Sequence, residues 1–312
     1  MSNEVKDEAD NKKFYLVVAR HGERWDYVQR NAGHGADWIA TAKRPWDPPL
    51  SPLGLKQASR LGSHLMEKLA ELKLPPIAAC YSSPFLRCRQ TSCQAVEAMM
   101  NGGTATTAET SAPLKVQIEI GLSESLNKSW YRSWALPGAD STWGFVPPEE
   151  KQPGKRRRGL NEYSPEELHL SSRVPAPELL TWKEATHESS PNLQTLQDME
   201  YQSTTAICKP FALRPKVLVE TAEEQQTRMF QVVANKARPG QTILVVSHGG
   251  PVTHLYEKLS GKHWNVHGES KYCCYSIYEC DSPEKMSEVW KTVVVNESKY
   301  LDDLWSDGTA NI

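Results

Sequence analysis

The residues from Phe14 to Ala19 form an unbroken apolar run, which constrains the fold more than any other stretch of the chain. A run of this kind, rich in β-branched residues, is typical of a strand buried on both faces of a parallel sheet. It leads directly into Arg20-His21-Gly22-Glu23-Arg24. Ligands of open α/β sheets bind just beyond the carboxyl ends of the strands, so we expect a site here.

The histidine at this strand end lies between two arginines in the sequence, Arg20 and Arg24. Positive charge beside an imidazole favours its neutral form, and guanidiniums hold phosphoryl oxygens through paired hydrogen bonds. His21 is therefore a candidate nucleophile toward a phosphoryl group held by these arginines. A solvated charge cluster at a strand end is the alternative interpretation.

Two strand–loop–helix units follow one another in the first third of the chain. Residues 51–72 have apolar residues three or four apart, which predicts an amphipathic helix with Ser51 as N-cap and Pro52 in its first turn. Residues 77–81 predict a short strand, and Ser83-Pro84 repeats the capping pattern before a helix over 85–100. The expected fold class is α/β, with three layers and a mostly parallel central sheet between helices on both faces.

The remaining elements are less regular. Residues 25–49 are expected to be a long functional connection rather than a regular element. Further helices are expected over 221–237 and 251–259. Further strands are expected over 116–120, 242–247, 272–278 and 290–295.

The expected organisation is a single domain over residues 14–300, between a disordered segment at 1–13 and a tail at 301–312. Residues 125–215 break the periodic pattern with recurring prolines, which indicates an insertion that caps the site. Short helices are expected at 165–168 and 177–183. The tryptophans of this insertion, which could line the pocket or anchor the cap, are Trp130, Trp134 and Trp143.

Composition excludes several classes of protein. A formal net charge of −2 argues against a nucleic-acid footprint, and no apolar run is long enough to span a membrane. Seven cysteines without CxxC spacing favour reduced thiols in a cytoplasmic protein, and no metal or cofactor is expected. His263 and His267 are interpreted as surface residues.

Four groups of polar or charged residues, distant from one another in the sequence, lie at the carboxyl ends of expected strands. A parallel sheet brings these strand ends to one edge. These groups are Arg20-His21 with Arg24, then Arg87, then Glu124, and finally His248. Phosphoryl transfer needs such a set, because arginines neutralise the phosphoryl oxygens while one histidine attacks and an acid protonates the leaving oxygen. Glu23 competes with Glu124 for the acid role by its proximity to His21.

On these motifs the chain resembles the histidine phosphatase superfamily, the group of phosphoglycerate mutases and histidine acid phosphatases. The matching segments are Arg20-His21-Gly22, residues 50–58 (LSPLGLKQA), residues 82–91 (SSPFLRCRQT) and Ser247-His248-Gly249. Within the superfamily it most resembles the phosphatase domain of the T-cell ubiquitin-ligand phosphatases. That likeness rests on Arg24 with Asp26, on Leu86-Arg87-Cys88 and on Gly121-Leu122-Ser123-Glu124.

The resemblance implies a role for each matched residue. His21 would be the nucleophile that forms a phosphohistidine, and Glu124 the proton donor. The phosphate pocket would consist of Arg20, Arg24, Arg87 and His248, the last also counted as catalytic. The implied fold is phosphoglycerate mutase-like.

The expected function is that of a metal-independent phosphomonoesterase. Its substrate would be a phosphate monoester, either a small molecule or a phosphoprotein. The chain could also form a homodimer. Arg24 and Asp26 replace the small polar residue and the Asn that follow the motif in mutases, which leaves mutase-type phosphotransfer as the runner-up. A weakly catalytic phospho-ligand-binding regulator is the other alternative.

Overall fold

The computed structural model describes residues 13–35, 47–102, 113–124, 196–198, 201, 221–282, 285–286 and 288–305. The expected short helices at 165–168 and 177–183 and the three insertion tryptophans lie outside these residues. So do nearly all of the expected cap and of the N-terminal segment 1–13.

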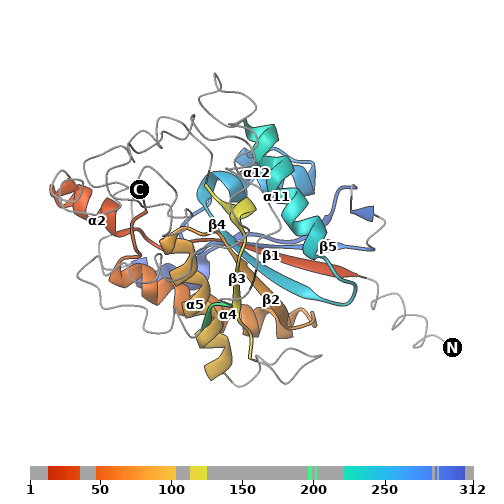
Figure 1. Ribbon diagram of the computed structural model, residues 1–312, viewed down its shortest axis with the longest axis horizontal. Helices are drawn as coiled ribbons and strands as arrows, with labels where there is room; N and C mark the ends of the chain where they lie inside the picture. Colours follow the sequence, from red (N-terminus) through yellow and green to blue (C-terminus); the bar gives the residue numbers. More distant parts are fainter. Residues whose placement is uncertain are drawn as a thin grey trace, which may run out of the picture.

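A six-stranded sheet forms the centre of the fold, with strand order β3-β2-β4-β1-β5-β6 (Figure 1). The strands are β1 (Phe14–Arg20), β2 (Ile77–Ser82), β3 (Val116–Ile118), β4 (Thr242–Ser247), β5 (Tyr275–Cys280) and β6 (Lys291–Glu297). The first four pair in parallel, while β5 is antiparallel to both β1 and β6. The predicted α/β class with a mostly parallel sheet is therefore confirmed.

Helices cover both faces of the sheet, so the molecule has three layers (Figure 1). Alternate residues of β1 point to opposite faces. Val17 and Ala19 join the core under α4 (Pro52–Glu71) and α5 (Leu86–Asn101). Leu16 and Val18 join the core under α11 (Ala222–Lys236) and α12 (Gly249–Ser260). Burial on both faces explains why β1 is apolar throughout.

Helix α4 begins as the sequence predicts. Ser51 is its N-cap, its hydroxyl accepts a hydrogen bond from the Gly54 N–H, and proline follows in the first turn. The N-terminal end lies against the loop after β1, because a Cβ on Gly22 would come within 2.6 Å of the Gly54 carbonyl oxygen. This close approach joins the first turn of α4 to the loop that carries His21.

The close packing of α4 on α5 makes Gly62 a sensitive position. A Cβ on Gly62 would lie 2.1 Å from the Ala95 carbonyl oxygen, so Gly62→Ala must push the helices apart. Alanine is intrinsically better than glycine in a helix by ~1 kcal/mol, yet we expect a net loss of about 1–3 kcal/mol in the free energy of unfolding. Urea unfolding of Gly62→Ala beside Ser63→Ala, on the exposed side of α4, tests this. Equal stability of the two variants would contradict the close contact.

Two predicted features of the first half of the chain are wrong. Residues 25–49 are not wholly irregular, since Trp25–Asn31 forms helix α2. This helix has no buried residue, which explains why it leaves no apolar pattern in the sequence. The N-cap of α5 is Phe85, without a side-chain capping bond, and Ser83 is not its cap.

Smaller differences concern element ends. Helix α12 begins at Gly249, ahead of Pro251, and β3 stops at Ile118, where the short helix η1 (Ile120–Leu122) follows. Packing continues past residue 300, because Leu301 is fully buried in the core on the α4 side. Among the described helices, none is long and apolar enough to cross a bilayer.

Candidate functional site

The candidate site lies at the carboxyl ends of the parallel strands, where the loops after β1, β2, β3 and β4 meet. His21 directly follows β1, and His248 directly follows β4, the strand paired with β1 in parallel. The two imidazole rings are 5.3 Å apart between centroids. Arg87 comes from the first turn of α5, and Glu124 follows η1. The structure thus brings all four predicted groups together.

The protonation state of His21 follows from its hydrogen bonds. Its Nδ1 lies 2.7 Å from the Gly22 carbonyl oxygen, which can only accept, so Nδ1 carries the proton. Nε2 is then left with a lone pair, toward which Arg87 Nε donates a hydrogen bond at 3.3 Å. This tautomer presents Nε2 as the reactive nitrogen.

The surroundings of His21 keep it neutral. The side chain is buried, and burial together with the positive charges of Arg87 and Arg20 holds the pKa of His21 well below its ordinary value. Arg24 contributes in the same direction. The expectation that flanking arginines favour the neutral imidazole therefore agrees with the site's electrostatics.

Arg87 is fully buried and incompletely satisfied. Within the described residues, its Nη1 and Nη2 have no hydrogen-bond partner. The nearest carboxylates are Asp47, whose Oδ1 is 3.9 Å from Nη1, and Glu124, whose Oε2 is 4.0 Å from Nη2. Burial lowers the pKa of Arg87, and the charge of Arg24 acts in the same direction. Buried guanidinium donors in this state can bind the oxygens of an anion.

Arg20 and Arg24 are each held by different partners. The Arg20 guanidinium donates to the Ser270 carbonyl oxygen and stacks 4.3 Å from the ring centroid of Tyr272. Its Nε has no hydrogen-bond partner within the described part of the chain. Arg24 makes a bidentate pair with Asp26 at 3.0 and 2.7 Å. Both arginines are therefore fixed in orientation.

His248 is oriented by Ser83. Its Nε2 shares a 2.7 Å hydrogen bond with Ser83 Oγ, and its Nδ1 lies 3.6 Å from Glu124 Oε2. Burial, followed by the charge of Arg87, holds the pKa of His248 well below its ordinary value. The Ser83 hydroxyl, expected to cap a helix, instead orients this ring.

The two candidate acids occupy different environments. The Glu23 carboxylate accepts a 2.5 Å hydrogen bond from the Ser51 hydroxyl, and the backbone N–H of Glu23 donates to Gln57 Oε1 at 2.9 Å. Burial raises the pKa of Glu23, which the Ser51 bond partly opposes. Glu23 therefore joins the β1 loop to α4, whereas the Glu124 carboxylate faces Arg87 and His248.

Several residues of this region were not found from the sequence. Asp47 ends a connection without a motif, and its Oδ1 accepts a 2.7 Å hydrogen bond from the Leu86 N–H. Thr91, one turn beyond Arg87, accepts from the Gly22 N–H at 3.0 Å. Tyr272 precedes β5, and its ring centroid is 5.8 Å from that of His21. Thr91 lies in a matched segment and Tyr272 in an expected strand, but nothing in the sequence marks either as part of the site.

In the described part of the chain, no three His, Cys, Asp or Glu side chains are grouped as a metal site would need. His263 and His267 flank the short helix η5 (Trp264–Val266) and are both exposed, in agreement with their prediction as surface residues.

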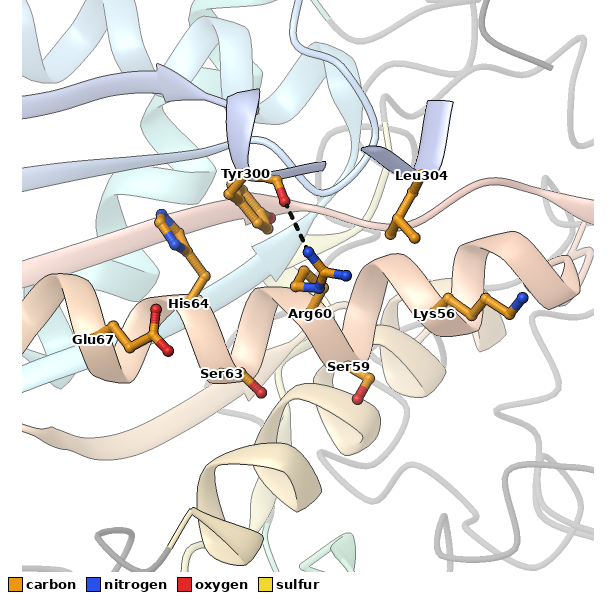
Figure 2. A pocket seen from close by; sticks show the side chains of 8 residues that line it. All are labelled: Lys56, Ser59, Arg60, Ser63, His64, Glu67, Tyr300 and Leu304. Carbon is orange, nitrogen blue, oxygen red and sulfur yellow. Dashed lines mark hydrogen bonds between the residues drawn. The ribbon is translucent and has the colours of Figure 1, made fainter. Parts of the chain in front are cut away.

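A groove of about 600 Å³ lies along α4, on the side that faces Tyr300 and Leu304 (Figure 2). It is lined by Lys56, Ser59, Arg60, Ser63, His64, Glu67, Tyr300 and Leu304. The Arg60 guanidinium pairs with Asp303 at 3.1 Å and donates to the Tyr300 carbonyl oxygen at 3.5 Å. The side of α4 that meets the β1 loop carries Gly54 and Gln57 instead, so this groove is separate from the site.

The free energy of unfolding is expected to fall as the pH is lowered below about 6.5, the ordinary pKa of histidine. His21 and His248 have lower pKa values in the folded protein, so between those values and 6.5 the unfolded state binds more protons. Each such histidine contributes up to ~1.4 kcal/mol per pH unit in that window, with full stability above it.

Urea unfolding at pH 7.5 and 5.5 measures this slope, with His21→Asn as the comparison. The variant should have the shallower slope. Burial also lowers the pKa of His64, but His64 contributes equally to the slopes of both proteins, so its contribution cancels in the comparison. Equal slopes would contradict a buried neutral His21.

Fold and site together define an α/β protein with a neutral, arginine-flanked histidine at the carboxyl ends of its parallel strands. Residues 16–126 match the family model described as histidine phosphatase superfamily, branch 1. The match extends over about a third of the chain. It includes the segments of His21, Arg87 and Glu124 but not that of His248.

Several solved structures are similar to this chain at low identity. The phosphoglycerate mutase from Bacillus anthracis str. Sterne is 17% identical, with a TM-score of 0.48, over 95% of this chain and 99% of that chain. A mycobacterial glucosyl-3-phosphoglycerate phosphatase is 16% identical, with a TM-score of 0.44, over 92% and 100%. The ecdysone phosphate phosphatase from Bombix mori is 16% identical, with a TM-score of 0.46, over 91% and 93%. A comparison with curated proteins finds none that matches.

Proposed function

We propose that the chain is a metal-independent phosphomonoesterase that forms a phosphohistidine on His21. The observation that carries this proposal is the neutral His21, whose Nε2 faces Arg87. Around it, Nη1 and Nη2 of Arg87 and Nε of Arg20 are donors without a hydrogen-bond partner in the described residues. A phosphoryl group would accept from these donors while presenting its phosphorus to Nε2.

The proposed reaction has two steps. Nε2 of His21 attacks phosphorus, the N–P bond forms, and the bond to the leaving oxygen breaks as that oxygen takes a proton from Glu124. Water then attacks phosphorus and gives a proton to the Glu124 carboxylate, while the N–P bond breaks, its electron pair returns to Nε2 and inorganic phosphate is released. Arg20, Arg24 and Arg87 neutralise the phosphoryl oxygens, so the charge is balanced without a metal.

Turnover of p-nitrophenyl phosphate in the presence of EDTA tests the proposal. Continued release of phosphate with a chelator present supports it, and loss of activity that added metal restores would contradict it. Incubation with 3-phosphoglycerate and its bisphosphate separates hydrolysis from phosphotransfer. Isomerised phosphoglycerate in place of inorganic phosphate would favour the mutase alternative.

The natural substrate is either a small phosphate monoester or a phosphoprotein. The resemblance to the T-cell ubiquitin-ligand phosphatases stays a prediction, since the family match supports the superfamily only. A panel of phosphorylated metabolites and phosphopeptides, compared by kcat/KM, decides between a small-molecule and a phosphoprotein substrate.

The acid role of Glu124 predicts a dependence on the leaving group. Glu124→Gln should lower kcat/KM for an alkyl phosphate such as β-glycerol phosphate by about 10²-fold or more. The value of kcat/KM for p-nitrophenyl phosphate should fall far less, because its leaving oxygen needs little protonation. Glu23→Gln is the matched control, and it should not discriminate between the esters. If Glu124→Gln slowed both esters equally, Glu124 would not be the acid.

A further inference from the structure

The backbone from Gly121 to Glu124 is held by side chains from two other elements. Nη1 of Arg228 donates to the Gly121 carbonyl oxygen at 2.6 Å and to that of Ser123 at 3.2 Å, and its Nη2 donates to that of Glu124 at 3.4 Å. The Ser247 hydroxyl donates to the remaining carbonyl, that of Leu122, at 2.7 Å. Every carbonyl of this segment therefore has a side-chain donor.

Arg228 is unusual for its position in α11. It is only 6% exposed, and it is the one charged residue among the buried residues of that helix. Its neighbours Met229, Val232 and Val233 pack with Leu122 in an apolar core, which already attaches η1 to α11. Burial of a guanidinium costs free energy unless its donors are satisfied. The planar fork of arginine is suited to several carbonyls at once, which lysine cannot match.

The segment that Arg228 holds carries the proposed acid. From this backbone the Glu124 carboxylate reaches to 3.6 Å from His248 Nδ1 and 4.0 Å from Arg87 Nη2. A shift of the segment by about 1 Å would move the carboxylate relative to the leaving oxygen, which can cost ~10²-fold in rate. Apolar packing of Leu122 does not by itself set the rotation of the peptide groups that follow it.

We propose that Arg228 is a positioning residue for Glu124, a role that rests on the proposed function. It acts through the backbone of residues 121–124 and does not touch the reacting phosphoryl group. It joins α11 to the segment that follows β3 and η1 in the chain.

Kinetics with two esters test this role. Arg228→Met should lower kcat/KM for β-glycerol phosphate by about 10- to 100-fold. For p-nitrophenyl phosphate the change should stay under about threefold, and inhibition by vanadate should be unaffected, because Arg228 lies outside the phosphate pocket. Arg238→Met is the control, since Arg238 also donates to backbone carbonyls, those of Asn235 and Ala237, but at the far end of α11. It should behave as the wild type.

A double-mutant cycle separates positioning from general stabilisation. In a Glu124→Gln background, Arg228→Met should have little further effect on β-glycerol phosphate. Equal losses for both esters, or fully additive losses in the cycle, would overturn the proposal. If Arg228→Met does not melt cooperatively, Arg228→Lys takes its place, and failure of both to fold would show a role in folding alone.

Amide hydrogen exchange provides a readout that does not depend on activity. Residues 119–124 should exchange faster in Arg228→Met than in Arg238→Met, while α12 stays unchanged. If the wild type hydrolyses neither ester, the proposed function fails, and this comparison still decides whether Arg228 holds the segment. Equal exchange in the two variants would overturn that claim.

Discussion

His21→Ala is expected to abolish nearly all phosphatase activity, with a loss in kcat on the order of 10⁴-fold. The reason is that Nε2 of His21 keeps an unprotonated lone pair in contact with Arg87, because Nδ1 donates to the Gly22 carbonyl oxygen. His248 cannot substitute readily, since its Nε2 is engaged with Ser83 Oγ.

Single-turnover and steady-state assays with p-nitrophenyl phosphate measure this loss. His64→Ala is the control, because His64 is a partly buried histidine that stacks on Tyr300, 4.3 Å between centroids, on the other side of α4. It should retain activity. Substantial turnover by a folded His21→Ala protein would mean that His21 is not the nucleophile.

Arg87→Met is expected to cause the second large effect, a fall of about 10²–10³-fold in kcat/KM together with weaker inhibition by phosphate and vanadate. Arg87 is fully buried, contacts Nε2 of His21, and has two terminal nitrogens without a hydrogen-bond partner in the described residues. A methionine keeps much of the apolar stem and removes these donors.

Both quantities are measured on the same preparation, with Arg60→Met as control. Arg60 is exposed, its partner is Asp303, and its replacement should change neither value. An Arg87→Met protein that binds vanadate as tightly as the wild type would contradict the assignment of Arg87 to the phosphate pocket.

The sheet and most of its helices could be predicted because burial on two faces leaves long apolar runs. Thr242–Ser247 was predicted with its observed ends, and the cap of α4 at Ser51 is confirmed. Helix α2 could not be predicted, since it buries no residue and so has no apolar periodicity. Ser83-Pro84 was misread because a cap signature does not reveal that a distant histidine, His248, competes for the hydroxyl.

The site residues were predictable where reactive or charged side chains come soon after the end of a strand. His21, Arg87, Glu124 and His248 were expected to meet because parallel strands end at one edge, and the structure places them together. Their chemical roles stay proposals.

Residues such as Asp47, Tyr272 and Arg228 were not predictable in this way. Each reaches the site through contacts between segments far apart in the chain, which local sequence patterns do not encode.

The central claim is that a phosphoryl group is transferred to Nε2 of His21. Rapid quenching in base during turnover of p-nitrophenyl phosphate, followed by peptide mapping and ³¹P NMR of the phosphopeptide, tests it directly. We predict an acid-labile, base-stable phosphate on His21, attached at Nε2 because Nδ1 is protonated and bound to the Gly22 carbonyl oxygen. A phosphate on another residue, or turnover without any phosphoenzyme, would contradict the mechanism.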